Sequence, residues 1–380
     1  MKIVCDENIP LAGRFFEALG ELVYYSGRAI SSDNVRDADI LLVRSVTCVN
    51  EALLAGSRVK FVGTATIGED HIDKHYLKMQ GIGFANAPGC NACSVAEYVL
   101  SVIVEHALDM SDEPGMSVLR QRRVAIVGAG NVGTKIKQLC DGLGIPAFCY
   151  DPFKPALTSM AVEEIVTADI VTFHTPLTRE GAYPTYHMGD RLFFENLKPG
   201  ALLINTSRGA VFDNEHLFDV LEHRRDLRVV LDVWEGEPYI NTNLLQRCYL
   251  ASAHIAGYSY DGKVRGTEML FNAVRKHFNS PVMAPVLPKD NQLLIRPASK
   301  LKGLALLGYC MGVAYSVRGD DQTFRAKLAQ AGSKQALGEY FDYLRKNYSV
   351  RREFNNYHII QPQICVDDKR CLESLGFNFA

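Results

Sequence analysis

The chain has 380 residues, 47% hydrophobic and 22% charged, with a formal net charge of −2. This length exceeds one compact core, so two or three domains are expected. The nearly balanced charge argues against a nucleic-acid or membrane-surface partner. The start of the chain lacks an apolar signal segment, and the apolar stretch 303–317 is shorter than the ~20 residues that span a bilayer. A cytoplasmic location is therefore expected.

Ten cysteines are scattered along the chain, and two of them form the motif Cys90-Asn91-Ala92-Cys93. Such a motif could be a redox pair or half of a metal site. The sequence has no second pair and no histidine cluster at metal-ligand spacing. We therefore expect structural thiols in a reducing compartment, and no metal.

The first 85 residues alternate short apolar runs with helical patterns. Strands are predicted at 2–5, 22–25, 40–44, 60–62 and 83–84, and helices at 11–19, 50–54 and 71–80. This alternation predicts a parallel sheet with helices on both faces.

A helix predicted at 92–108 leads to a second alternation that starts near residue 122. Its strands are predicted at 124–127, 147–150, 170–174, 202–205, 229–232 and 249–251, followed by a helix at 267–277. The first domain lacks a final helix, so 258–279 should pack back on it. The expected fold class is α/β, with two doubly wound parallel-sheet domains, one of them a Rossmann domain.

After residue 285 the character of the chain changes. Helices are predicted at 301–317 and 323–347 and a strand at 357–366, with no catalytic motif. We expect a substrate-binding domain (1–92 and 258–285), an NAD-binding domain (93–257) and a C-terminal α+β domain (286–380). Apolar stretches around Leu304–Met311 and Ile359–Ile364 are more than about 95 residues are expected to bury alone, so a two-fold homodimer is expected.

The segment Gly128-Ala129-Gly130-Asn131-Val132-Gly133 follows an apolar strand and precedes a helix expected at 134–143. Gly128 permits a tight turn, Gly130 lets the backbone approach a pyrophosphate, and Gly133 lets the helix pack against the sheet. The helix N-terminus then presents amides to the phosphates. The predicted cofactor contacts here are Gly128, Gly130, Asn131, Val132 and Gly133.

Asp151 ends the next predicted strand. A carboxylate there accepts the ribose hydroxyls and repels a 2′-phosphate, which favours NAD over NADP. Lys154 and Arg179 are nearby cations that count against this preference. Thr175 lies where the adenosine half of a dinucleotide would pass, and His174 before it is interpreted as a packing residue.

Three side chains that suit oxidation of a 2-hydroxy acid follow in order. Arg208 comes after a strand and can grip a carboxylate with two parallel bonds. His254 can take the hydroxyl proton, and Glu237 can orient His254 and stabilise its protonated form. Glu235 is an alternative partner. Asp232 is expected near the nicotinamide end of the cofactor.

At these residues the chain resembles the D-isomer-specific 2-hydroxyacid dehydrogenase family over about residues 1–280. The family's nucleotide fingerprint matches Gly128–Gly133, and its arginine, glutamate and histidine match Arg208, Glu237 and His254. Asn86-Ala87-Pro88-Gly89 with Val95-Ala96-Glu97 matches the start of the family's dinucleotide domain. The resemblance implies an NAD-dependent 2-hydroxyacid dehydrogenase.

Four segments, Lys2–Pro10, Val43–Thr47, Gly63–His71 and His254–Ser259, resemble a branch of the family that acts on a phosphorylated hydroxy acid and carries a C-terminal dimerisation domain. The resemblance implies substrate contacts at Ser45, Thr66 and Tyr258. It implies cofactor contacts at Asp151, Thr175, Thr206, Ser207, Arg208, Asp232 and Gly257.

Two departures from general members argue against a simple substrate such as lactate: Ala253 stands where many relatives have proline, and the loop Thr64-Ala65-Thr66 is different. Three alternatives stay open. They are a 3-phosphoglycerate dehydrogenase, a non-catalytic NADH-sensing corepressor and a purely structural dimerising protein.

Overall fold

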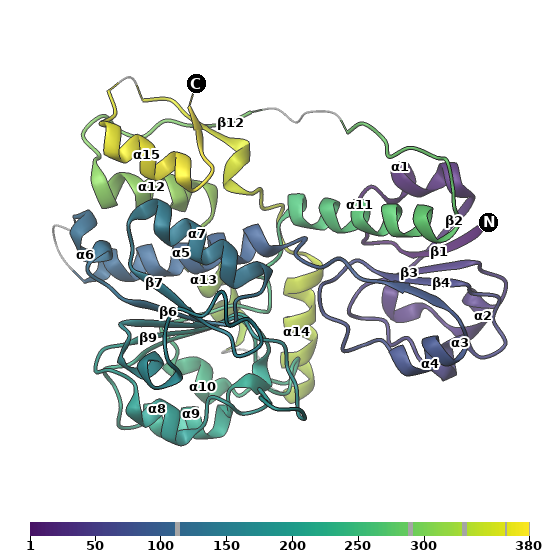
Figure 1. Ribbon diagram of the computed structural model, residues 1–380, viewed down its shortest axis with the longest axis horizontal. Helices are drawn as coiled ribbons and strands as arrows, with labels where there is room; N and C mark the ends of the chain where they lie inside the picture. Colours follow the sequence, from purple (N-terminus) through teal and green to yellow (C-terminus); the bar gives the residue numbers. More distant parts are fainter. Residues whose placement is uncertain (111–114, 288–291, 329–332, 362, 380) are drawn as a thin grey trace. The chain divides into compact units, whose positions relative to one another are not determined.

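The computed structural model describes residues 1–110, 115–287, 292–328, 333–361 and 363–379 (Figure 1). The chain divides into two compact units. The first contains Met1–Asn91 and Ser259–Asn291, and the second contains Ala92–Tyr258 and Gln292–Ala380. The segment after residue 258 thus returns to the unit built by the first 91 residues.

The first unit is built on a five-stranded parallel sheet. Its strands, in spatial order, are β2 (Glu21–Tyr25), β1 (Lys2–Asp6), β3 (Ile40–Val43), β4 (Phe61–Thr64) and β5 (Gly83–Ala85). Its helices are α1 (Ala12–Phe16), η1 (Glu17–Leu19), η2 (Gly27–Ala29), α2 (Ser32–Val35), α3 (Glu51–Leu54), α4 (Lys74–Met79) and α11 (Tyr260–His277).

Helices cover both faces of this sheet. Successive strand residues point to opposite faces, so each strand contributes side chains to both cores. Ile40 and Leu42 of β3 join the cluster that contains α1 and α11, whereas Leu41 and Val43 join the cluster formed with α2, α3 and α4. The five strands lie close to their predicted positions. Helix α2 was not predicted, although Ser31 and Asn34 form a capping box at its start.

The second unit contains a six-stranded parallel sheet. Its strands, in spatial order, are β11 (Leu250–Ala251), β10 (Arg228–Leu231), β9 (Leu202–Asn205), β8 (Ile170–Phe173), β6 (Val124–Val127) and β7 (Ala147–Tyr150). The strand order reverses beside β6, which is where open α/β sheets form their ligand crevice. The predicted fold class, with two parallel α/β sheets, is confirmed.

Helices cover both faces of the second sheet. They are α5 (Ala92–Asp109), α6 (Met116–Arg120), α7 (Asn131–Leu143), η3 (Val162–Thr167), α8 (Arg191–Asn196), η4 (Gly209–Val211), α9 (Asn214–Leu221) and α10 (Thr242–Arg247). Helix α7 begins three residues before its predicted start, because residues of the glycine-rich turn already form its first turn.

The C-terminal region adds a small parallel sheet of β12 (Leu293–Ile295), β13 (Tyr357–Ile359) and β14 (Asn378–Phe379). Its helices are α12 (Gly303–Ala314), α13 (Val317–Leu328), α14 (Lys334–Lys346), η5 (Phe354–Asn356) and α15 (Val366–Ser374).

Two predictions in the C-terminal region were wrong. The helix predicted at 323–347 is two helices, because the Ser333 side chain accepts the Ala336 amide and starts α14. The strand predicted at 357–366 ends at Ile359. Its last residue already begins α15, which carries two carboxylates in its first turn, where they favour a helix N-terminus.

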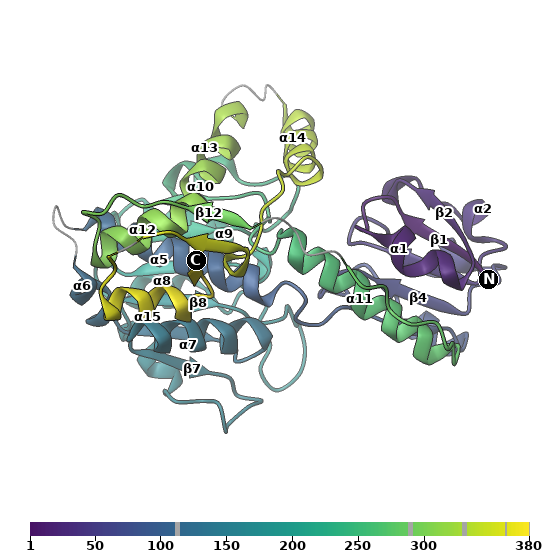
Figure 2. The same ribbon diagram turned by 90° about the horizontal axis from the view of Figure 1, so that it is seen from above.

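The C-terminal region packs on the second sheet's own helices. Helix α12 contacts α5 and α15 contacts α7 (Figure 2), and α13 contacts strand β11. Leu304, Leu307 and Met311 are at most 2% exposed, and Ile359 is fully buried. Most of the apolar surface that motivated the homodimer prediction is therefore buried within one chain, so that argument for a partner copy no longer stands.

In the described part of the chain, no helix is both long and apolar enough to cross a bilayer, and no group of three metal-ligating side chains comes together. The described residues include all ten cysteines and contain no disulfide.

Candidate active site

The glycine-rich turn joins β6 to α7 and leaves room for a ligand. Gly128 has a φ of +98°, and a Cβ there would lie 2.8 Å from the His174 carbonyl oxygen. A Cβ on Gly133 would lie 1.9 Å from the Gly128 carbonyl oxygen, whereas one on Gly130 would meet nothing within 4 Å. Glycine is thus needed at 128 and 133 for the fold, and the space at Gly130 fits a pyrophosphate approaching the N-terminus of α7.

Asp151 follows β7 and lies against the same turn. Its carboxylate accepts hydrogen bonds from the Ala129 amide at 2.9 Å and from the Phe153 amide at 3.0 Å. Lys154 donates to the Ala129 carbonyl oxygen at 3.0 Å. Each carboxylate oxygen of Asp151 carries a further lone pair, so the group can also accept ribose hydroxyls.

The end of β8 supplies a neutral histidine and an unpaired hydroxyl. Burial lowers the pKa of His174 to about 3, and its ring bonds to the hydroxyls of Thr172 and Thr206. His174 is therefore a packing residue and no acid–base group. Among the described residues, the buried Thr175 hydroxyl next to it has no hydrogen-bond partner, which fits a site that a ligand completes.

Arg208 lies after β9 in extended backbone. One guanidinium nitrogen donates to the Ser207 carbonyl oxygen at 2.8 Å, and the side-chain amide of Asn205 donates to the Arg208 carbonyl oxygen at 3.0 Å. The Asn205 side chain also accepts from the amide and hydroxyl of Ser207. The loop after β9 is thus ordered by its own side chains at the carboxyl edge of the sheet.

His254 and Glu237 form a direct pair. His254 Nδ1 lies 2.8 Å from Glu237 Oε2, and Glu237 Oε1 accepts the Trp234 amide at 2.7 Å. Burial alone would raise the pKa of Glu237, but the His254 ring and the Trp234 amide outweigh burial and lower it. Because Nδ1 is engaged, Nε2 is the nitrogen left for a substrate proton.

Glu235, the alternative partner, lies elsewhere. One carboxylate oxygen is 2.8 Å from His187 Nε2, and Glu235 also exchanges hydrogen bonds with Asn214. The structure therefore brings together His254 and Glu237, and leaves Glu235 with His187.

Asp232 orders the loop that carries His254. Its buried carboxylate accepts from the Ser252 hydroxyl at 2.6 Å, the Ile255 amide at 2.7 Å and the Ala256 amide at 3.1 Å. The His254 amide donates to the Asp232 carbonyl oxygen at 2.7 Å. Burial raises the pKa of Asp232. In the described residues this carboxylate is used to shape the loop.

Tyr258 ends this loop and contacts the C-terminal region. The Arg345 guanidinium lies 5.8 Å from the centre of the Tyr258 ring, and the Tyr348 ring meets it edge-on at 5.9 Å. Arg345 also helps to lower the pKa of Glu237. Neither Arg345 of α14 nor Tyr348 just after that helix was predicted to lie near the catalytic pair.

The first unit holds the other predicted substrate residues. Ser45 is exposed in the loop after β3, and the Thr66 hydroxyl bonds to Thr64 at 2.7 Å and to the Gly68 carbonyl oxygen at 2.9 Å. Arg44 lies 3.7 Å from the buried Asp6 carboxylate. Burial, together with the charge of Arg44, lowers the pKa of Lys263 to about 8.

Comparison with known proteins identifies the family. An erythronate-4-phosphate dehydrogenase from Cellvibrio japonicus is 44% identical, with 99% of each chain covered. Counterparts from Edwardsiella ictaluri and Azotobacter vinelandii are 43% and 45% identical, over 100% and 94% of this chain and 99% and 94% of theirs. The chain belongs to the erythronate-4-phosphate dehydrogenase family.

Two family models match separate parts of the chain. The D-isomer specific 2-hydroxyacid dehydrogenase NAD binding domain matches residues 98–256, which include the glycine turn, Arg208, Glu237 and His254. A domain of unknown function, DUF3410, matches residues 287–376. NAD is therefore the cofactor that this domain binds.

Solved structures show the same fold. An NAD⁺-bound 3-phosphoglycerate dehydrogenase from Entamoeba histolytica superposes with a TM-score of 0.64 at 24% identity, covering 74% of this chain and 96% of its own. A D-lactate dehydrogenase from Aquifex aeolicus, solved with NAD and lactic acid, gives 0.60 at 22% identity, covering 73% and 95%.

Sequence reasoning missed Lys263, Arg345, Tyr348 and Arg351 as residues near functional segments. Lys263 had a usable signal, since it lies five residues after the Tyr258 that the family resemblance already assigned. Arg345 and Arg351 had none, because arginines in a polar stretch are typical of a solvated surface.

Proposed function

We propose that this chain oxidises 4-phospho-D-erythronate to 2-oxo-3-hydroxy-4-phosphobutanoate with NAD, a step of pyridoxal 5′-phosphate biosynthesis. The observation that carries the proposal is the Glu237–His254 pair at 2.8 Å. It lies in a chain that matches erythronate-4-phosphate dehydrogenases over its whole length. A histidine oriented by a carboxylate is the base that hydroxyl oxidation needs.

Proton removal falls to His254. Neutral Nε2 takes the proton of the C2 hydroxyl, and Glu237 stabilises the imidazolium that forms through its bond to Nδ1. When bound, NAD accepts the hydride that leaves C2. In the proposed cofactor site, Gly128, Gly130, Asn131, Val132 and Gly133 hold the pyrophosphate and Asp151 holds the ribose. Thr175, Thr206, Ser207, Asp232 and Gly257 complete the set of proposed cofactor residues.

Arg208 is proposed to hold the C1 carboxylate, because a guanidinium can make two parallel bonds to it. Tyr258, Ser45 and Thr66 are proposed as further substrate contacts. The assignments of Tyr258, Ser45 and Thr66 rest on the resemblance to the family.

The substrate phosphate needs donors, and Arg44 with Lys263 is the pair that we propose. Burial and the Arg44 charge lower the pKa of Lys263 to about 8. A phosphate dianion near both groups would relieve their repulsion. Thr47, three residues after Arg44, is buried, and its hydroxyl donates to the Gly27 carbonyl oxygen. A Lys263→Met variant should raise KM for the phosphorylated substrate and leave NAD affinity unchanged.

Absorbance of NADH tests the reaction directly. The enzyme is supplied with NAD and, in separate assays, 4-phosphoerythronate, 3-phosphoglycerate or D-lactate. The proposal requires the highest kcat/KM with 4-phosphoerythronate. Preference for 3-phosphoglycerate would show a different member of the fold, and no turnover with any of the three would contradict a dehydrogenase function.

We also propose a homodimer in the cytoplasm, which rests on the resemblance to relatives with a C-terminal dimerisation domain. Light scattering should give a mass of about twice 42.2 kDa. A mass near 42.2 kDa at micromolar concentration would refute the dimer.

A further inference from the structure

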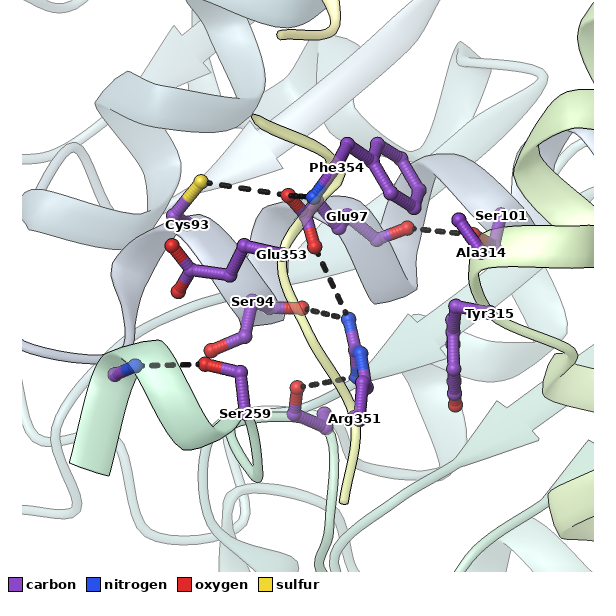
Figure 3. A network of polar contacts seen from close by, with 12 residues as sticks. Cys93, Ser94, Glu97, Ser101, Ser259, Ala314, Tyr315, Arg351, Glu353 and Phe354 are labelled. Carbon is purple, nitrogen blue, oxygen red and sulfur yellow. Dashed lines mark hydrogen bonds and ion pairs between the residues drawn. The ribbon is translucent and has the colours of Figure 1, made fainter. Parts of the chain in front are cut away.

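Arg351, in the segment between α14 and η5, reaches the loop that carries His254. Only 3% of its side chain is exposed. The guanidinium donates to the carbonyl oxygen of Ala256 at 3.1 Å and to that of Ser94 at 2.7 Å (Figure 3). One buried arginine thus joins the C-terminal region, helix α5 and the loop 254–258.

Arg351 lies beside the buried side chain of Glu97. Glu97 Oε2 lies 3.6 Å away, and Glu97 Oε1 accepts the Phe354 amide at 2.8 Å (Figure 3). The guanidinium also lies 3.7 Å from the centre of the Tyr315 ring. Burial outweighs the charge of Arg351 at Glu97 and raises the pKa of that carboxyl to about 8. The guanidinium makes its direct hydrogen bonds to two backbone carbonyl oxygens, which points to a geometric role.

A second contact holds the far end of the same loop. Tyr348 packs edge-on against Tyr258, and its hydroxyl donates to Asp320 at 2.8 Å. Asp320 also accepts the Tyr315 hydroxyl at 2.8 Å, and Tyr315 stacks under Arg351. A continuous set of contacts therefore runs from Tyr258 through the C-terminal region and back to Ala256.

Both backbone groups of Ala256, its N–H and its carbonyl oxygen, make hydrogen bonds to buried side chains. Asp232 accepts its amide at 3.1 Å, and Arg351 donates to its carbonyl oxygen. Two residues earlier, His254 has a φ of +57°, a left-handed conformation that is uncommon for residues other than glycine. Such a conformation persists where the surroundings determine it.

We propose that the C-terminal region, which matches a domain of unknown function, positions the catalytic loop, and that Arg351 is the positioning residue. The contacts that carry this role are made within one chain. The inference rests on the proposed function, in which His254 is the base.

The test compares Arg351→Lys with Arg318→Met. Lysine keeps the charge but loses the planar fork that serves two carbonyl oxygens. Arg318 fastens the same C-terminal region to the same helix, with bonds of 2.6 Å to Glu105 and Asp109, and no described contact joins it to the loop.

We expect kcat of Arg351→Lys to fall about 10- to 100-fold, because small misplacements of a reacting group have effects of that size. KM for 4-phosphoerythronate should change little, since Arg208 is intact. Arg318→Met should keep kcat within about twofold, as exposed ion pairs contribute little. Wild-type kcat in a folded Arg351→Lys enzyme would overturn the proposal, and so would an equal fall in both variants.

Hydrogen exchange provides a readout that does not depend on the substrate. The amides of Ile255 and Ala256 should exchange faster in Arg351→Lys than in wild type or Arg318→Met. If wild type does not oxidise 4-phosphoerythronate, the proposed function fails while this measurement still tests positioning. If Arg351→Lys does not fold, Tyr348→Leu takes its place, and wild-type exchange at the loop in that variant would refute the idea.

Discussion

Two carboxylates of the second unit each lie beside a cation or a potential cation, and their pKa values shift in opposite directions. Glu237 is 2.8 Å from a ring nitrogen of His254 and also accepts a backbone amide, and its pKa is lowered. Glu97 is 3.6 Å from Arg351, and burial raises its pKa to about 8 although Arg351 opposes the rise.

Exposure separates the two pairs as well. The side chains of His254 and Glu237 are 33% and 19% exposed, whereas those of Arg351 and Glu97 are 3% and 1% exposed. The shortest hydrogen bonds of the Arg351 guanidinium go to two backbone carbonyl oxygens. Each carboxylate accepts one backbone amide, so the difference lies in the 2.8 Å and 3.6 Å distances to the neighbouring base, the deeper burial of Glu97 and the charge of Glu353 beside it. One pair therefore suits proton transfer and the other suits fixing a loop.

The largest expected effect is at the catalytic pair. His254→Ala removes the base, so kcat should fall about 100- to 10,000-fold, the usual range for general acid–base catalysis. NADH binding, followed by fluorescence, should survive because the glycine turn is untouched. Near wild-type kcat in this variant would end the assignment of His254.

A second arginine sharpens the contrast with Arg351. Arg208→Lys keeps the charge and loses the fork, so kcat/KM should drop by about 2–3 kcal/mol if Arg208 holds the substrate carboxylate. The same substitution at Arg351 should act on kcat. Steady-state kinetics of both variants separates substrate grip from loop positioning, and an unchanged kcat/KM would show that Arg208 does not bind the carboxylate.

Glu237→Gln tests the effect of the Glu237 charge on His254. Oxidation needs neutral His254, and an ionised Glu237 favours the protonated ring. Losing that charge should therefore move the rising limb of the pH–rate profile to lower pH. The profile of kcat/KM from pH 5 to 9 measures the shift. A limb that stays in place would count against the pairing.

The smallest expected effect concerns the second carboxylate. The pKa of Glu97 is about 8 in the folded protein, above its ordinary value of 4.5. The folded state thus binds the proton more tightly, and this contribution to stability is present at low pH and is lost as pH rises from about 4.5 through 8. Urea denaturation at several pH values should show a shallower decline for Glu97→Gln than for wild type. Parallel curves would contradict the raised pKa.

Local patterns were sufficient for much of the fold and of the site. Alternating strands and helices predicted both parallel sheets, because buried parallel strands require short apolar runs between helices. The sequence also predicted the glycine turn, Arg208, Glu237 and His254, since each lies within six residues after a strand end and open sheets gather those ends along one edge.

The sequence by itself determined the two parallel sheets, the glycine turn and the order of the strand-end residues, because each depends on interactions within a few positions of the chain. It did not determine the surroundings of Arg351, which lies 95 positions from Ala256. Arg351-Arg352-Glu353 is typical of an exposed charged stretch, and only the packing of the C-terminal region on α5 buries its first arginine. Tertiary structure also decided that Leu304 and Met311 are covered within the chain. Burial depends on contacts between distant segments, which no local pattern encodes.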